Sequence, residues 1–196
     1  MTDSSNFEPI GAFLEILPST DEHLTINFSP GFAPRKQRWR NYGLSADFLG
    51  DYFATFFPGD ELPEDKIGKP ETIKGSVSYI ANELLENAMK YNEESAKFPV
   101  SISLYLYDEK LVFLVSNYTD QASGQAYGDY VKKLLTSDID ELYGQHLERA
   151  ATSNGVSQMG LLTILNDYGA NLGLKVEPAS ESPDLYRVTT MVLLPV

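Results

Sequence analysis

The amino-acid sequence predicts an α+β fold, in which helices cover one face of a mostly antiparallel, mixed sheet. Three stretches lead to this prediction. Residues 100–107 alternate strictly between apolar and polar side chains, which is typical of a half-buried strand. Residues 73–91 place apolar side chains every three or four positions, which is typical of a helix. Two further apolar stretches near the carboxyl end, 173–178 and 186–196, predict a final pair of strands.

The remaining elements follow from similar patterns. A short strand is expected at 23–28, where Ser29 and Pro30 end it, and a helix at 36–57, where Pro58 and Gly59 end it. Four basic residues in the first turns of this helix are expected to form a solvated face or, alternatively, a docking patch: Arg35, Lys36, Arg38 and Arg40.

The second half of the chain begins with a tight hairpin. The short connection after residue 107 predicts that residues 100–116 form two antiparallel strands. A polar, glycine-rich segment with weaker helical patterns follows at 118–155, and such insertions often serve as functional lids. A helix opened by Gly160 and closed by Gly169 comes next. We therefore expect an N-terminal extension, 1–22, and a single domain, 23–196.

Composition excludes several classes of function. Twenty-eight acidic residues against 15 basic ones give a net charge of −13, which repels nucleic acid. The chain has no cysteine and only two histidines, which argues against thiolate catalysis and a Cys- or His-ligated metal cluster. The amino terminus has neither a basic n-region nor a long apolar run, so we expect a cytoplasmic protein that does not enter membranes.

Three functional side chains share one face of the helix at 73–91. Glu83, Asn87 and Lys90 lie in a narrow stripe at helical spacing. An Asn oxygen can ligate Mg²⁺, a Lys can contact phosphate, and a Glu can deprotonate or orient a nucleophile. By itself the pattern is weak evidence for a site and more typical of a solvated helix face, because Glu and Lys are good helix formers.

Two motifs give the stripe a more specific interpretation. The segment "YIANELLENAMKYN" resembles the N-box of the GHKL superfamily, the histidine-kinase, Hsp90 and gyrase type of ATPase. The downstream "SQMGLLTIL" is similar to the second glycine box of the anti-sigma-factor serine kinases. Both motifs occur in the expected order, and the order of elements matches from Leu24 to the end of the chain. The resemblance implies a Bergerat-type two-layer sandwich that binds ATP and Mg²⁺.

Within the superfamily, the chain looks most like the SiaB-type kinases of partner-switching signalling modules. This resemblance implies transfer of the ATP γ-phosphate to a Ser or Thr of a small antagonist protein. By the same resemblance, Glu83 is the general base, Asn87 the Mg²⁺ ligand and Lys90 a phosphate contact. Gly155 and Gly160 are candidates for phosphate binding at a helix start, or they only permit a tight turn into a buried helix.

The first glycine box of the superfamily is altered. Its adenine-binding Asp is replaced by Asn117 if the hairpin is aligned correctly, and its Gly-x-Gly turn is absent. Asn117 still offers an acceptor oxygen but lacks the charge of a carboxylate. Asp120 is an alternative adenine acceptor. An unrelated enzyme that pairs Glu83 with Asp120 has little support, because nothing fixes their separation.

Two functions therefore remain open. The first is an ATP-dependent serine/threonine kinase that acts on a partner protein. The second is a degenerate member of the fold that sequesters or scaffolds a signalling partner without nucleotide turnover. A homodimer is a further option, because the aromatic-rich first helix offers four large side chains that one subunit need not bury entirely: Trp39, Tyr42, Phe53 and Phe56.

Overall fold

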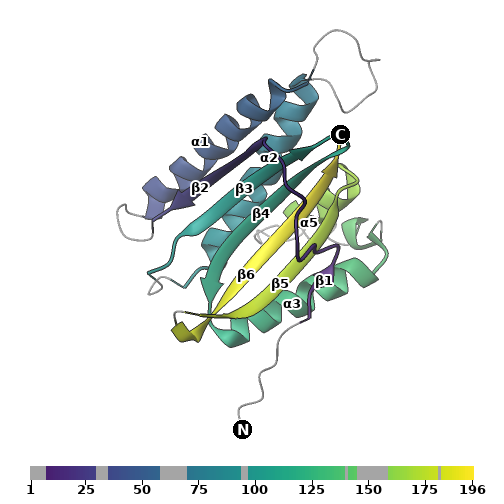
Figure 1. Cartoon of the computed structure of the whole chain (residues 1–196). Helices are drawn as coiled ribbons and strands as arrows, with labels where there is room; N and C mark the ends of the chain where they lie inside the picture. Colours follow the sequence, from purple (N-terminus) through teal and green to yellow (C-terminus); the bar gives the residue numbers. More distant parts are fainter. Residues whose placement is uncertain are drawn as a thin grey trace.

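A single six-stranded sheet organises the structure. The computed structural model describes residues 8–29, 35–57, 70–93, 97–139, 141–144, 159–180 and 182–196. The strands are β1 (Ile10–Gly11), β2 (His23–Phe28), β3 (Val100–Tyr107), β4 (Lys110–Thr119), β5 (Asn171–Ala179) and β6 (Ser182–Pro195). They lie in the order β1-β5-β6-β4-β3-β2, and every pairing between neighbours in this sheet is antiparallel, so the expected mixed character is not seen in the described strands (Figure 1).

The helices form a second layer on one face of this sheet (Figure 1). They are α1 (Arg35–Ala54), α2 (Pro70–Tyr91), α3 (Gln121–Thr136) and α5 (Gly160–Asn166). The two-layer α+β architecture expected from the sequence is confirmed. Among the described residues, no helix is both long enough and apolar enough to cross a membrane.

The core lies between these layers because the strands alternate as the sequence predicted. Ile102 and Leu104 of β3 face the helices and are fully buried, as is Phe113 of β4. From the other layer, Ile80 and Leu84 of α2 meet them in the same apolar cluster. Because α2 also packs on α1, it is buried along two sides and one strip of its surface remains for other contacts.

The amino-terminal segment belongs to the sheet in a way that the sequence did not predict. β1 pairs with β5 and forms one edge of the sheet, and the chain then crosses the face opposite the helices to reach β2 (Figure 1). Lys175 pairs with Glu15 at 2.8 Å, and the hydroxyl of Tyr107 donates to the carbonyl of Pro18 at 2.8 Å. A two-residue strand carries too little periodicity to be recognised from sequence.

The segment expected to act as a lid contains regular structure at its start. β4 continues through Thr119, and Gln121–Thr136 forms the helix α3, which packs on β5 and β6. Residues 145–158, which include Gly155, lie outside the described residues. The lid itself therefore stays a prediction.

The crossing of α1 and α2 depends on Gly50. A Cβ atom at this position would lie 2.7 Å from the carbonyl oxygen of Lys74 and would also overlap the hydroxyl of Ser78. A backbone oxygen within a helix cannot move aside cheaply. By contrast, a Cβ atom added to Gly43, on the same helix, would have no neighbour within 4 Å.

We expect Gly50→Ala to lower the free energy of unfolding by about 1–3 kcal/mol, because the helices must separate to admit the methyl group. The matched variant Gly43→Ala should raise it by about 0.5–1 kcal/mol through better helix propensity. Urea unfolding followed by circular dichroism measures both. Equal effects of the same sign would contradict this account of the crossing.

Candidate functional site

The strip of α2 that remains free of the core carries Glu83, Asn87 and Lys90. All three side chains line one cavity of about 110 Å³. Three other elements complete its walls, with Trp39 from α1, Tyr127 and Tyr130 from α3, and Gly160 and Leu161 from α5. The residues that the sequence placed on one helix face are thus brought together with the start of the later helix.

Glu83 of α2 is in direct contact with the start of α5. The Cα of Gly160 packs against the Glu83 carboxylate so tightly that a Cβ at position 160 would overlap it. Burial, and secondarily the charge of nearby Glu86, raises the pKa of Glu83 above its ordinary value. Among the described residues, no cation forms an ion pair with Glu83. Glu83 is therefore held as a half-buried acid with enhanced basicity.

Asn87 and Lys90 extend the site along the helix. Lys90 is exposed, and its ammonium lies 5.3 Å from the ring centre of Tyr91. Asn87 is half-buried one turn before it and borders both the main cavity and a smaller one beside it. The site thus offers a carboxylate, a carboxamide and an ammonium in sequence along one groove.

The smaller cavity contains Asn117. This side chain is 5% exposed, and its amide nitrogen has no hydrogen-bond partner. The cavity measures only about 10 Å³ and is also lined by Thr119, Thr190 and Tyr127. Tyr127 lines both cavities, and its phenol interacts with the side chain of Thr190. Burial raises the pKa of Tyr127 to about 12, so the phenol stays protonated.

Asp120 has a structural role at the start of α3. Its carboxylate accepts hydrogen bonds from the backbone nitrogen of Ser123 at 2.9 Å and from the Ser123 hydroxyl at 2.6 Å. These bonds, the hydroxyl one first, lower the pKa of Asp120. Asp120 is exposed and lines neither cavity, so the structure does not bring it together with Glu83. The last candidate, Gly155, lies outside the described residues.

The aromatic wall of the site was not predicted from the sequence. Tyr91, Tyr127 and Tyr130 form a chain of rings whose centres are 5.7 Å and 6.4 Å apart. The two α3 tyrosines stand three positions apart, which is a helical signal. The polar and glycine-rich composition of 118–155, typical of an irregular insertion, obscures this signal.

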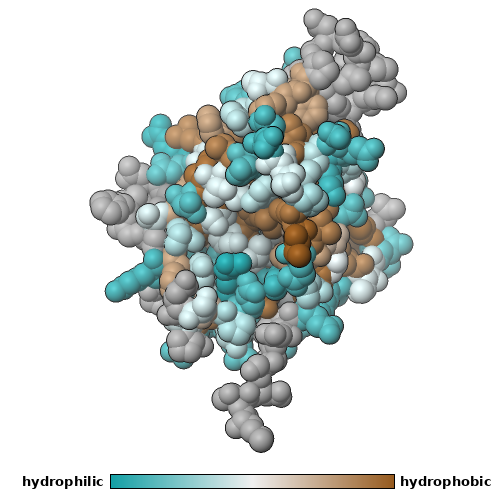
Figure 2. All heavy atoms as spheres, in the orientation of Figure 1, coloured by the Kyte–Doolittle hydropathy of each residue, from teal (hydrophilic) through white to brown (hydrophobic). Residues whose placement is uncertain are grey.

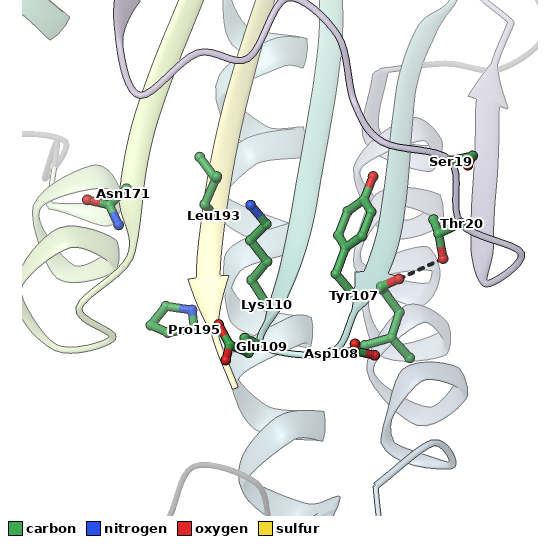
Figure 3. A pocket seen from close by; sticks show the side chains of 10 residues that line it. Ser19, Thr20, Tyr107, Asp108, Glu109, Lys110, Asn171, Leu193 and Pro195 are labelled. Atoms are coloured by element: carbon green, nitrogen blue, oxygen red, sulfur yellow. Dashed lines mark hydrogen bonds between the residues drawn. The ribbon is translucent and has the colours of Figure 1, made fainter.

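A larger cavity lies elsewhere. A cavity of about 730 Å³ opens on the sheet face opposite the helices, where Tyr107, Lys110, Asn171 and Leu193 project from four neighbouring strands (Figure 3). The Thr20 hydroxyl, which donates to the carbonyl of Leu106 at 2.8 Å, closes one side. We place the candidate site on α2 in spite of its smaller volume, because the half-buried carboxylate and the functional side chains converge there.

A metal ion at this site would have to be coordinated jointly by the protein and a bound substrate. No group of three or more His, Cys, Asp or Glu able to hold a metal occurs in the part of the chain that the structure describes. This is compatible with Mg²⁺, which commonly uses one or two protein oxygens together with substrate phosphates. Asn87 and Glu83 supply protein oxygens of this kind.

Comparisons with known proteins identify a structural relative. A chain in the crystal structure of the SiaB–SiaC complex from Pseudomonas aeruginosa superposes with a TM-score of 0.59 at 14% sequence identity, covering 87% of this chain and 89% of that one. No protein-family model matches the sequence. No curated protein matches it either. The protein therefore shares the fold of this structure.

The raised pKa of Glu83 leads to a pH-dependent stability. The folded state binds the Glu83 proton more tightly than the unfolded chain does, so ionisation of this carboxylate lowers the free energy of unfolding. This loss of stability grows as the pH rises from about 4.5 through the raised pKa of Glu83. Glu83→Gln should therefore melt at a higher temperature than the native chain at pH 7–8. This gain should shrink as the pH falls through that window.

Glu109→Gln is the matched control, because it removes the same charge from the exposed β3–β4 turn. Melting curves of all three proteins between pH 4 and pH 8 provide the measurement. A Glu83→Gln gain that is constant with pH, or equal to that of the control, would disprove the burial argument.

Proposed function

We propose that the protein is a partner-switching regulator that binds Mg-ATP and transfers its γ-phosphate to a serine or threonine of a small partner protein. The observation that carries this proposal is the single cavity on α2 in which Glu83, Asn87 and Lys90 meet the glycine that opens α5. Each group has the chemistry that one part of the reaction requires.

The phosphate half of the site fits the proposed ligand. The carboxamide oxygen of Asn87 is a hard ligand that suits Mg²⁺, and the exposed ammonium of Lys90 suits a phosphate oxygen. Gly160 lets the start of α5 approach the Glu83 carboxylate more closely than a residue with a Cβ atom could. When bound, Mg-ATP would supply the phosphoryl group and the charge neutralisation for its transfer.

The protein supplies the base in this scheme. The hydroxyl oxygen of the partner's Ser or Thr forms a bond to the γ-phosphorus, and the bond from that phosphorus to the β–γ bridging oxygen breaks. The hydroxyl proton passes to Glu83, and ADP leaves. A carboxylate whose pKa is raised accepts a proton more readily than a solvated one, which suits Glu83 to this role.

The half of the site that would hold the adenine ring fits the proposed ligand less well. Asn117 lies where the resemblance expects an adenine contact, and its unpaired amide group is an orphaned polar atom that a ligand would satisfy. However, the adjoining cavity of about 10 Å³ is far too small for a purine. Adenine could enter only if the side chain of Tyr127 turned away from Thr190.

The structural relative supports a protein partner. It was crystallised as a SiaB–SiaC complex, and the shared fold covers most of both superposed chains. A substrate that is itself a folded protein also suits a shallow site bordered by exposed Lys90 and Trp39. The partner would be a protein with a serine or threonine hydroxyl that can accept the phosphoryl group.

Millimolar Mg-ATP should raise the melting temperature of the native protein, because it binds only the folded state. Asn87→Ala should abolish this shift. Asn171→Ala is the matched control, since it removes the same amide from the large cavity on the opposite face and should leave the shift intact. If Asn171→Ala alone abolished the shift, nucleotide would bind the opposite face and the proposed site would be wrong.

Phosphotransfer separates binding from chemistry. When the native protein is incubated with labelled ATP, Mg²⁺ and the small proteins encoded by neighbouring genes, it should transfer the label to one of these proteins. Glu83→Gln should lower the rate by about 10²–10⁴-fold, the usual contribution of a general base, while the Mg-ATP melting shift persists. Labelling at the native rate by Glu83→Gln would remove Glu83 from the catalytic role.

One observation favours a second function. The closed cavity at Asn117, together with the missing carboxylate, favours a binding protein that holds its partner without nucleotide turnover. Absence of any melting shift with Mg-ATP, combined with capture of a partner by the native chain, would select this function over the kinase.

A further inference from the structure

The solvent face of α1 carries a continuous apolar stripe. Leu44, Phe48, Tyr52 and Phe56 follow one another every four residues and are all exposed, Leu44 by 60% and Phe48 by 52%. These four residues are called the α1 stripe below. Figure 2 shows brown side chains along the upper-left flank of the molecule, where Figure 1 places α1. Five of the six exposed large apolar residues in the described chain belong to α1 or its final turn.

The stripe differs from the aromatic set that the sequence suggested. Tyr42 and Phe53 of that set are buried in the core, where Tyr42 meets Phe28 edge-on with ring centres 4.4 Å apart. They point to the sheet side of α1, whereas Leu44 and Phe48 lie on the opposite side of the helix and Tyr52 and Phe56 lie on its flank, where their rings contact Phe53. The surface available for association is therefore set by Leu44, Phe48 and Tyr52, which were not among the residues expected from the sequence.

The rings of the α1 stripe are already ordered into a ladder. Phe48 and Tyr52 have ring centres 6.1 Å apart, and Tyr52 and Phe56 meet edge-on at 5.4 Å. Such contacts preorganise the side chains and reduce the entropy lost on association. A contiguous apolar ridge of this kind on a helix with a well-packed opposite face marks an interaction surface.

We propose that a second copy of this chain covers the α1 stripe, with the two α1 helices antiparallel across a twofold axis at Phe48. The spacing of the stripe is self-complementary in this arrangement. Leu44 and Tyr52 stand four residues on either side of Phe48, so Phe48 meets its own copy and Leu44 of each chain meets Tyr52 of the other. A second copy alone would cover the exposed apolar side chains of the α1 stripe.

Charge along α1 favours the same orientation. The first six residues of the helix contain four of the 15 basic residues of the chain, and its second half carries Asp47 and Asp51. Antiparallel packing places the basic start of each helix beside the acidic half of the other. Arg40, which is exposed, would then approach the exposed ring of Phe56. Elsewhere the net charge of −13 opposes contact between copies.

The size of the stripe limits its affinity. A 20-residue helix is about 30 Å long, and one face of it buries less than the roughly 1,200–2,000 Å² of a stable interface. The dimer should therefore form reversibly, with a dissociation constant on the order of micromolar. Sedimentation of the native chain should show a monomer–dimer equilibrium that moves with concentration.

Because the chain contains no cysteine, introduced cysteines can be cross-linked without interference from native thiols. Phe48→Cys should oxidise to a covalent dimer, because the twofold axis brings the two Cys side chains together within the short range a disulfide needs. Leu44→Cys mixed with Tyr52→Cys should cross-link to each other much faster than either cross-links to itself. Ile16→Cys, at a position 86% exposed on the opposite face, is the control for random collision and should stay monomeric.

Several outcomes would overturn the proposal. A native chain that sediments as a monomer at every concentration to about 1 mM contradicts association through any surface. Cross-linking of Leu44→Cys to itself faster than to Tyr52→Cys contradicts the antiparallel arrangement. A third measurement uses Phe48→Asp, which should keep the native circular dichroism and melt as a folded monomer. A dimer that survives this substitution would lie on another surface.

Discussion

The position of α2 between α1 and the sheet is the constraint on which the rest of the structure depends. Fully buried Ile80 and Leu84 hold one side of the helix on β3 and β4, and Gly50 lets α1 approach the other side closely. A helix buried on two sides leaves a third strip free. Glu83, Asn87 and Lys90 occupy that strip. Their convergence therefore follows from packing, and a shift of α1 would change the site as well as the core.

This constraint also explains how much the sequence could reveal. The strict alternation of β3 and the helical spacing of α2 are strong local signals, because each element buries one face against the same core. They predicted both layers, the hairpin and the shared helix face of Glu83, Asn87 and Lys90. Gly160 was recognised through its motif, and the structure gives that glycine a physical reason, since a larger residue would displace the Glu83 carboxylate.

What the sequence could not reveal depended on contacts between distant segments. β1 is only two residues long, and its place beside β5 follows from pairing across more than 160 positions. The tyrosine wall follows from the packing of α3 against β5 and β6, which no periodicity within α3 specifies. Likewise, helical spacing gave the aromatic residues of α1 but not which of them face solvent. Tyr42 and Phe48 are distinguished only once the sheet side of the helix is known.

The amide at position 117 connects stability to ligand binding. A carboxylate buried to the same degree would need a cation, and no ion pair of the described residues reaches this part of β4. The neutral Asn117 avoids that cost, yet its unpaired nitrogen still costs about 1–3 kcal/mol. A ligand that accepted a hydrogen bond from this nitrogen would recover part of that energy, but only after displacing Tyr127 from its contact with Thr190. Any ligand bound beside Asn117 would gain stability from the first contact and lose it from the second. A buried carboxylate would accept a hydrogen bond from a ligand, whereas the free amide donor of Asn117 favours a ligand atom that accepts one.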